Sequence, residues 1–597
     1  MTSKQRTWGQ FATPTDVADL LLGFCLRRPE DRLLDPSCGD GALLRRAARW
    51  QSWLSSSAAG GPPGTLFGVE LDPDAAAVAA TIPGTTIRRA NFFTLDAAQM
   101  APSAEARRSA GFDAVIGNPP YTRAEWIARL DAAEAQLPLF PDEPPGASPR
   151  PGLLPSELGA ALGGRAGLHA YFFLHSLTFL REGGRLGFIV PNGWLDVAYG
   201  TALKQFLLDH FRVLAVVESA VERWFAAAGV NTCVVILERA EDPAARAANR
   251  VRFVRLLRPL RDLLAYPVDD ARRVGAVEQL VGRLLPGADR HSHDVAVRLR
   301  GQGELHAADR WGNLLRAPDV HLRPRPALVP LGQWAAVRRG FTTGANDFFY
   351  LDRERIARWG IEAAFRRPLL KSLRGAAALR LVPGECDYEL LDVPAEARLD
   401  GTAVAAYLAW GESQGIDRRQ TCAGRRPWYA LPAQPPGDLL LAKGVWQRHF
   451  TVVAGGPLAV DQQIYRLQPV DGVLPGAAAA LLNSVWFALQ CELRGRVNLG
   501  EGVLWLATYE LAGLPLPDPR MLDAGSADQL AAAFDRLAAR PLAATAGDLQ
   551  QPDRRSLDEL VFDLVGLSAA EREEARGALG QALAGRRQRA KRVTNDE

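Results

Sequence analysis

The sequence predicts an α/β protein with a largely parallel sheet, followed by further domains of different character. Residues 13–240 alternate short β-branched runs with amphipathic helical stretches, the pattern of successive strand–helix–strand units. From about residue 327 the strands become shorter, and arginine–aromatic neighbours become frequent. At 597 residues the chain also exceeds what one hydrophobic core usually supports, so two or three domains are expected.

Seven strands are expected in the first domain, which is enough for one sheet. They are residues 32–37, 65–71, 85–90, 112–118, 184–191, 213–219 and 231–239. A proline-rich stretch at about 131–164 separates the fourth strand from the fifth. A loop of that length inside a compact domain usually has a function or is disordered.

Composition excludes several classes of protein. The formal net charge of +3 is too small to indicate a nucleic-acid partner by itself. The first ten residues lack the apolar core of a signal peptide, and no apolar run reaches membrane-spanning length. The six cysteines form no C-x-x-C pair, which disfavours structural zinc and favours a reducing cytoplasm. The close pair His291 and His293 is interpreted as part of a solvated loop, so no metal is expected.

A glycine-rich turn stands at the carboxyl end of the first strand. Residues 35–41 (DPSCGDG) follow the strand and precede a helix, and Gly39 and Gly41 allow a sharp turn that approaches a ligand closely. Open α/β sheets bind nucleotides at this position. The turn matches neither the dinucleotide motif G-x-G-x-x-G nor the phosphate-binding motif G-x-x-x-x-G-K-[ST].

The ends of the next two strands fit an adenosine. Glu70 ends the second strand, where a carboxylate can accept hydrogen bonds from both ribose hydroxyls, although a solvated surface acid is the alternative. The third strand runs into Asn91 and Phe92, an amide and an apolar ring suited to an adenine base. Upstream, Thr13 is expected to cap a helix, with Asp16 as its capping-box partner.

The fourth strand delivers Asn118-Pro119-Pro120-Tyr121. The amine of adenine is a poor nucleophile because its lone pair is delocalised into the ring. The Asn118 side-chain oxygen and the Pro119 carbonyl can accept its N–H hydrogens and turn that lone pair towards a methyl donor. Pro119 and Pro120 fix the backbone without offering a competing N–H. Tyr121 offers a ring for stacking, worth roughly 1–3 kcal/mol per base. An ordinary turn at Asn-Pro is the alternative, which the glycine turn and Glu70 disfavour.

The order of these motifs resembles the gamma class of N6-adenine DNA methyltransferases, which includes the TaqI and Eco57I-type enzymes. The likeness rests on FATP (11–14), DPSCGDG (35–41), GVELDP (68–73), NPPY (118–121) and residues 167–195, and it is strong over about residues 9–240. It implies a class I S-adenosylmethionine-dependent methyltransferase fold with a seven-stranded, mostly parallel sheet, then an α+β DNA target-recognition domain and a helical C-terminal tail. It also implies that S-adenosyl-L-methionine is bound by Thr13, Asp35, Pro36, Gly39, Gly41, Glu70, Asn91 and Phe92.

By the same resemblance, residues 118–121 would hold the target adenine, which must leave the duplex to reach such a pocket. The stretch at 131–164 is placed to close over it. The family sandwiches the flipped base with a second aromatic, and Phe225 falls at the matching place, with a core phenylalanine as the alternative. The chain departs from the family at Asn91, where an aspartate is usual, and at residues 167–169, where Asn- or Asp-Leu-Tyr is common. Cofactor affinity is therefore expected to differ.

The segment after residue 327 carries arginines beside aromatics and glycine turns, as in residues 337–351 and 425–431. Such neighbours suit phosphate contacts and base-edge readout. These strings look like the target-recognition domains of Eco57I-type enzymes and of Type I specificity subunits. Singly each basic residue fits a solvated surface charge equally well, so the prediction rests on the cluster. The expected DNA-facing residues are Arg338, Arg339, Arg425, Arg426 and Lys443.

Four regions are therefore expected: a methyltransferase catalytic domain at 1–245, a connecting α/β segment at 246–326, a target-recognition domain at 327–522 and a helical C-terminal region at 523–597. The expected function is site-specific methylation of adenine N6 in double-stranded DNA, in a restriction-modification or phage-defence system. The expected location is the cytoplasm, at the nucleoid when DNA is bound. No lysine has a glutamate two positions earlier, as a Glu-x-Lys nuclease site requires, so a separately encoded nuclease or defence subunit is the expected protein partner.

Two alternatives remain open. Asn-Pro-Pro-Tyr also serves methyl transfer to RNA or to protein glutamine, although such enzymes are generally smaller and lack a large recognition domain. A non-catalytic DNA-recognition subunit with a degenerate methylase fold is the other alternative, which the intact Glu70 and residues 118–121 disfavour.

Overall fold

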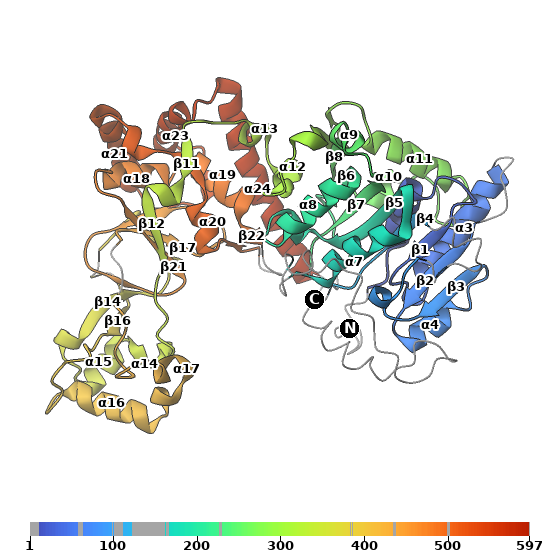
Figure 1. Cartoon of the computed structure of the whole chain (residues 1–597). Helices are drawn as coiled ribbons and strands as arrows, with labels where there is room; N and C mark the ends of the chain where they lie inside the picture. The colour runs from blue at the N-terminus through green and yellow to red at the C-terminus, as the bar shows by residue number, and fades with distance from the viewer. Residues whose placement is uncertain are drawn as a thin grey trace. The chain divides into compact units, whose positions relative to one another are not determined.

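The chain folds into two compact units, Met1–Ala317 and Pro318–Glu597, in the computed structural model (Figure 1). The structure describes residues 11–57, 64–97, 100, 111–121, 162, 166–225, 230–382, 384, 386–433, 437–497 and 502–595. The proline-rich stretch at 131–164 lies outside these residues apart from Leu162, and so do the first ten residues. Within the described part of the chain, no helix combines the length and hydropathy needed to cross a membrane.

The first unit is built on one ten-stranded sheet with the order β3-β2-β1-β4-β5-β7-β6-β8-β10-β9 (Figure 1). Strands β1 to β5 run parallel to one another, and β7 lies antiparallel between β5 and β6. All seven expected strands are present. Their bounds are β1 (Leu33–Asp35), β2 (Leu66–Glu70), β3 (Thr85–Arg89), β4 (Phe112–Gly117), β5 (Leu180–Pro191), β6 (Phe211–Ser219) and β7 (Thr232–Arg239).

Three further strands extend this sheet, which the sequence did not predict. β8 (Arg250–Leu256) pairs in parallel with β6, and β10 (Val295–Gly301) pairs with β8 and with β9 (Arg290–His291). Residues 246–317 therefore belong to the first unit and do not form a separate connecting segment. The physical reason is the open edge of β6, whose unpaired backbone groups β8 satisfies.

Each face of the sheet has its own hydrophobic core. One core includes α2 (Thr15–Cys25), α3 (Ala42–Ser57) and α11 (Arg273–Leu284). The other includes α7 (Leu168–Ser176), α8 (Gly200–His210) and α12 (Trp311–Arg316). Alternate strand residues enter the two cores, as Leu33 and Leu34 of β1 do. Because both faces are covered, inner strands such as β2 and β7 are buried over nearly their whole length, whereas β3 at the edge is not.

The start of α2 differs from the expected capping box. The helix begins at Thr15 with Pro14 as its N-cap, and no side chain caps it. Asp16 pairs instead with Arg273, which also contacts the fully buried Asp19. The prediction of Thr13 as the cap is therefore wrong, because the carboxylate of Asp16 finds a guanidinium, a stronger charge-assisted partner than a backbone N–H.

The second unit contains several small sheets. A five-stranded sheet has the order β12-β21-β17-β19-β15, and a four-stranded sheet has the order β13-β16-β14-β20. The four-stranded sheet and helices α14 to α17 form a lobe with its own aromatic-rich core (Figure 1). The bounds are β12 (Ala335–Arg339), β13 (Tyr350–Leu351), β14 (Arg366–Leu370), β15 (Arg380–Leu381), β16 (Tyr388–Leu391), β17 (Leu439–Ala442), β19 (Thr451–Ala454), β20 (Ala459–Val460), β21 (Ile464–Pro469), α14 (Asn346–Phe349), α15 (Arg353–Trp359), α16 (Ala403–Ser413) and α17 (Gln420–Ala423).

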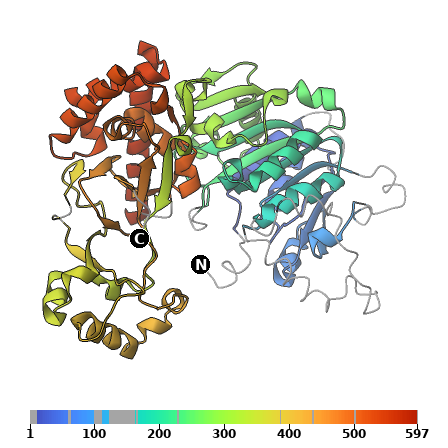
Figure 2. The same cartoon turned by 60° about the vertical axis from the view of Figure 1, so that its left-hand side comes forward.

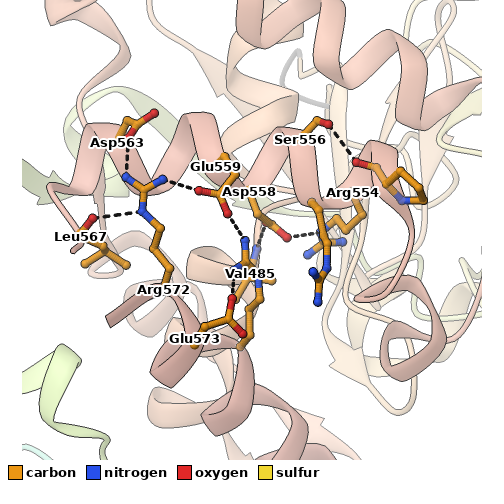
Figure 3. A network of polar contacts seen from close by, with 12 residues as sticks. Val485, Arg554, Ser556, Asp558, Glu559, Asp563, Leu567, Arg572 and Glu573 are labelled. Carbon is orange, nitrogen blue, oxygen red and sulfur yellow. Dashed lines mark hydrogen bonds and ion pairs between the residues drawn. The ribbon is translucent and has the colours of Figure 1, made fainter. Parts of the chain in front are cut away.

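The C-terminal helices belong to the same unit. Helices α21 (Ala524–Ala538), α23 (Pro552–Val565) and α24 (Ala569–Asn595) share one core with α18 (Pro475–Leu481), α19 (Val485–Arg494) and the five-stranded sheet (Figure 2). Figure 3 shows the polar contacts that reinforce this packing: Arg572 links Glu559 to Asp563, and Asp558 accepts a hydrogen bond from the Val485 nitrogen at 2.6 Å. The Asp558 carboxylate lies at the N-terminus of α19, where its negative charge is attracted to the positive end of the helix dipole.

Candidate active site

The carboxyl ends of four neighbouring strands bring the expected site residues together. β1 lies between β2 and β4 in parallel register, with Asp35 opposite Gly68 and Leu34 opposite Val115. The residues that end or follow these strands therefore meet at one edge of the sheet. The strand order reverses between β1 and β4, which is where open α/β sheets form their ligand crevice.

Glu70 holds the glycine turn. Its Oε2 accepts a hydrogen bond from the Gly39 nitrogen at 2.8 Å, and its Oε1 accepts from the Leu71 and Asp72 nitrogens at 2.9 and 2.8 Å. Burial raises the pKa of Glu70, and these three donors partly offset the rise. With 6% of its surface exposed, Glu70 is not a solvated surface acid.

The turn itself requires glycine. Gly39 has φ +55° and Gly41 has φ +80°, in the left-handed region that residues with a Cβ rarely adopt. A Cβ at Gly41 would come within 2.4 Å of Ile82, whereas a Cβ at Gly39 would meet no described atom within 4 Å. The turn is therefore packed on the Gly41 side and open on the Gly39 side, as a ligand-binding turn needs.

Asp35 is a buried carboxylate beside the end of β4. A Cβ at Gly117 would lie 3.1 Å from its Oδ1 and 3.3 Å from the Cδ of Pro36, so glycine permits this close approach. Burial raises the pKa of Asp35 to about 7, the Ser37 N–H lowers it, and the nearby charge of Glu70 raises it. The described residues form no salt bridge with Asp35, so this carboxylate is suited to a positively charged ligand.

The third strand end differs from the expected adenine site. Asn91 caps a short 3₁₀ turn, η1 (Phe92–Thr94), because its Oδ1 accepts a hydrogen bond from the Phe93 nitrogen at 3.0 Å. Phe92 is 3% exposed, and its ring lies 5.4 Å from that of Phe172, in the core. Phe93, rather than Phe92, is the partly exposed ring of this turn.

His175 supports the same turn, and the sequence did not single it out. Its Nε2 lies 2.9 Å from the Phe92 carbonyl and 3.1 Å from the Leu95 carbonyl. Carbonyls only accept, so Nε2 carries the proton and donates to both. Burial lowers the pKa of His175, so the ring is neutral at physiological pH. Buried histidines carry no distinctive sequence pattern by which this role could have been found.

The amide of Asn118 has a fixed orientation. Its Nδ2 donates a hydrogen bond to the Phe11 carbonyl at 2.8 Å, which identifies the nitrogen because a carbonyl cannot donate. Its Oδ1 is buried and has no hydrogen-bond partner among the described residues. Buried acceptors are normally satisfied, so this oxygen is suited to an N–H donor from a bound substrate.

Three aromatic rings lie beside this amide. The Tyr121 and Phe225 ring centroids are 5.9 Å apart with an interplanar angle of 84°, and Phe11 lies 5.7 Å from Tyr121 and 6.3 Å from Phe225. A base stacked between Tyr121 and Phe225 needs parallel rings about 7 Å apart, which is twice a contact distance of about 3.5 Å. The rings must therefore reorient to admit a base. Phe11 was not expected at the site, since its motif directed attention to Thr13, which is only half-buried.

The expected DNA-facing residues occupy different environments. Arg338 and Arg339 are exposed on the edge strand β12, and Arg426 is exposed in the lobe. The Nζ of Lys443 lies 5.5 Å from the Trp505 ring centroid. Arg425 packs inward instead: its guanidinium donates to the Thr343 carbonyl at 2.5 Å and lies 5.3 Å from the Phe349 ring centroid. Arg425 is therefore held inside the lobe through Nη2 and the Phe349 ring, while its Nε and Nη1 are buried without a hydrogen-bond partner among the described residues.

Two family models match the chain in separate parts. Residues 86–225 match the Eco57I restriction-modification methylase, and residues 320–546 match the C-terminal domain of the Type II methyltransferase M.Eco57I. The second match crosses from the small sheets into α21, in agreement with the core that these elements share.

Curated relatives and a solved structure agree with these matches. The chain is 29% identical to the Type II methyltransferase M.PaeR7I of Pseudomonas aeruginosa over 80% of each chain. It is 25% identical to M.XamI of Xanthomonas campestris pv. amaranthicola over 68% of this chain and 66% of that protein, so it spans slightly less than two thirds of M.XamI. The Type IIL restriction-modification enzyme MmeI shares the fold, with a TM-score of 0.54 and 14% identity over 97% of this chain and 75% of MmeI.

The expected fold class is confirmed: a class I methyltransferase sheet precedes an α+β domain and helices. The glycine turn, Glu70 and the Asn118 amide stand at the strand ends where this fold binds its ligands. The two family matches and the curated relatives together support a gamma-class restriction-modification methyltransferase of the Eco57I type with a C-terminal domain.

Proposed function

We propose that this protein transfers a methyl group from S-adenosyl-L-methionine to the exocyclic N6 amine of an adenine in DNA. The observation that carries the proposal is the Asn118 amide, whose nitrogen is held by the Phe11 carbonyl while its buried oxygen is left as an acceptor. An acceptor in this position can bind an N–H of the adenine amine. The bound amine then points its lone pair towards the methyl donor.

The cofactor of the family is S-adenosyl-L-methionine, which supplies an electrophilic methyl group on a positively charged sulfur. The buried Asp35, without an ion-pair partner among the described residues, fits that positive charge. The open side of the turn at Gly39 and the carboxylate of Glu70 fit the nucleoside. Thr13, Pro36, Gly41, Asn91 and Phe92 complete the proposed cofactor site, with Phe92 supporting it from the core.

The substrate adenine is proposed to leave the duplex and stack between Tyr121 and Phe225. The two rings contact each other edge-on and would have to turn to receive the base. Pro119 and Pro120 keep the main chain beside them free of N–H donors, so the Pro119 carbonyl can accept the second amine hydrogen. MmeI, which shares the fold, was solved in complex with DNA.

The second unit is proposed to bind the DNA target sequence. Lys443 lies beside β18 (Gly444–Val445), in a three-stranded sheet with β23 (Leu504–Trp505) and β22 (Arg496–Val497). On this sheet Arg496 donates to the Tyr509 Oη at 2.7 Å. Tyr509 is 68% exposed and Trp446 is 55% exposed. Exposed aromatics beside cationic groups suit contact with phosphates and bases.

The decisive experiment is modification-sensitive sequencing of DNA from a methylation-free host that expresses the gene. We expect N6-methyladenine within one recurrent sequence, and none in a host that expresses Asn118→Ala. Calorimetry of the variant should show cofactor affinity within about twofold of wild type, because Asn118 contacts the substrate amine. Unmodified DNA, together with tritium transfer from labelled cofactor to RNA or to protein glutamine, would replace the proposal with one of those substrates. A protein that binds DNA and no cofactor would be a non-catalytic recognition subunit.

A further inference from the structure

The segment Phe11–Pro14 connects the two halves of the site. It leads into α2 through Pro14, whose carbonyl accepts hydrogen bonds from the Val17 and Ala18 nitrogens at 3.0 Å. Phe11 packs against the core to which that helix contributes, and its carbonyl accepts a hydrogen bond from the Asn118 amide, 107 residues away in the chain. Phe11 thus supports the catalytic amide from the same stretch that carries Thr13, a proposed cofactor contact.

We propose that Phe11 is a positioning residue with two functions, which rest on the proposed methyl transfer. Its main-chain carbonyl selects the productive orientation of the Asn118 amide. Its ring is the third aromatic wall of the base pocket, behind Tyr121 and Phe225.

The carbonyl function follows from the symmetry of an amide side chain. Rotation of the Asn118 amide by 180° exchanges its oxygen and nitrogen at almost no steric cost. In the exchanged orientation Oδ1 would face the Phe11 carbonyl, acceptor against acceptor, and Nδ2 would face the substrate amine, donor against donor. The hydrogen bond at 2.8 Å removes that orientation. The acceptor is therefore in place before the base arrives, which lowers the cost of organising the site.

The wall function follows from the three ring contacts. Phe11 contacts both Tyr121 and Phe225, at 5.7 and 6.3 Å between centroids, so neither ring can turn to receive a base without changing its contact with Phe11. Phe11 supplies both this ring and the carbonyl that orients Asn118. A base that enters between Tyr121 and Phe225 therefore changes the ring contacts of the same residue that orients Asn118. The ring also anchors the main chain, since Phe11 is partly buried against the sheet core.

The carbonyl can be tested without changing a side chain. Ala12→lactic acid, introduced by codon suppression, converts the amide between residues 11 and 12 into an ester, whose carbonyl is a weaker acceptor. We expect kcat to fall by about fivefold, the effect of one weakened neutral hydrogen bond. The KM for cofactor and the fluorescence of 2-aminopurine placed at the target adenine, which reports base flipping, should stay within twofold. Ala543→lactic acid, at an exposed position of the second unit, is the matched control and should leave kcat unchanged.

The ring is tested by Phe11→Ala and Phe11→Leu. We expect Phe11→Ala to lower kcat by about tenfold or more and to reduce the 2-aminopurine signal, with cofactor affinity within threefold of wild type. Phe11→Leu, which keeps the apolar anchor, should recover most of kcat but not the full 2-aminopurine signal.

An ester variant with wild-type kcat would overturn the carbonyl function, and a parallel loss of cofactor binding, flipping and kcat in Phe11→Ala would reduce Phe11 to a structural residue. If the wild-type protein methylates no DNA, the proposed function and this inference fall together. Normal methylation by both Phe11 variants removes only the inference.

Discussion

The Oε2 of Glu70 lies 2.8 Å from the main-chain nitrogen of Gly39, so the end of β2 holds the turn that follows β1. Glu70→Ala would leave this nitrogen and those of Leu71 and Asp72 without their acceptor. Hydrogen bonds to a charged group contribute about 1.5–3 kcal/mol each, so we expect the Kd for S-adenosyl-L-methionine to rise at least tenfold. Isothermal titration calorimetry measures it. Glu396→Ala, at an exposed position of the second unit, should bind as wild type does. Unchanged affinity in Glu70→Ala would remove Glu70 from the cofactor site.

Cofactor affinity should depend on the protonation of Asp35. Burial, the largest cause, raises its pKa to about 7, and a positively charged ligand favours the ionised carboxylate. Below pH 7 the cofactor must displace a proton, so we expect affinity to fall about tenfold per pH unit there and to level off above pH 8. Calorimetry near pH 7 in two buffers of different ionisation enthalpy should show proton release on binding. Asp35→Asn should bind weakly and with no such pH dependence; a flat profile for the wild-type protein contradicts the prediction.

The same residue should affect stability in the cofactor-free protein. The folded pKa of Asp35, about 7, lies above its ordinary value of 3.8, so the folded state binds more protons between these values. The stabilisation from protonated Asp35 is therefore complete below pH 4 and is lost as pH rises through 7. We expect Asp35→Asn to raise the unfolding temperature of the first unit at pH 8 relative to wild type, and to leave it nearly unchanged at pH 4. Differential scanning calorimetry without cofactor distinguishes the two cases.

Phe225 is 5% exposed, which suits a core residue and a base-stacking residue equally. Leucine preserves the apolar character but has no aromatic face, whereas tyrosine preserves the face. If Phe225 stacks on the base, Phe225→Leu should lose roughly 1–3 kcal/mol of binding to the flipped base, while Phe225→Tyr stays close to wild type. The 2-aminopurine signal and kcat measure this, and thermal unfolding shows whether either variant is misfolded. Equal activity in both variants would make Phe225 a packing residue.

The arginines of the second unit should divide into two classes. Arg338 and Arg339 are exposed on an edge strand, so Arg338→Gln combined with Arg339→Gln should weaken DNA binding and reduce its salt dependence by about one counterion per lost phosphate contact. Fluorescence anisotropy over a series of salt concentrations measures both. Arg425 donates to the Thr343 carbonyl, so Arg425→Gln should destabilise the lobe and leave the salt dependence unchanged. If Arg425→Gln also reduced the salt dependence of DNA binding, Arg425 would instead be a residue that contacts DNA.

The sequence was sufficient where a structural feature follows from residues close in the chain. Strands β1 to β7, the glycine turn and Asn118 could all be placed, because apolar runs and turn residues are local signals. The hydrogen bond from Asn118 to the Phe11 carbonyl could not be predicted. Its acceptor is a main-chain oxygen 107 residues away, which is present whatever side chain stands at that position. Likewise nothing in the alternation of residues 250–301 indicates that β8 and β10 extend the sheet beyond β6, since an edge strand and an inner strand can have the same pattern. The inward packing of Arg425 also depends on tertiary contacts, which the local sequence RRPWYAL (residues 425–431) does not indicate.

The core that the C-terminal helices share with the five-stranded sheet has a consequence for protein engineering. Leu439 of β17, Leu530 of α21 and Leu583 of α24 belong to that core, and the Arg586 side chain near its far end donates to Glu492 of α19 at 2.7 Å. A chimera cut near residue 522 would separate helices from the strands that complete their packing, and both fragments would expose apolar surface. To exchange the proposed DNA sequence preference between relatives, the segment from Pro318 through the last helix would therefore have to be moved as one piece.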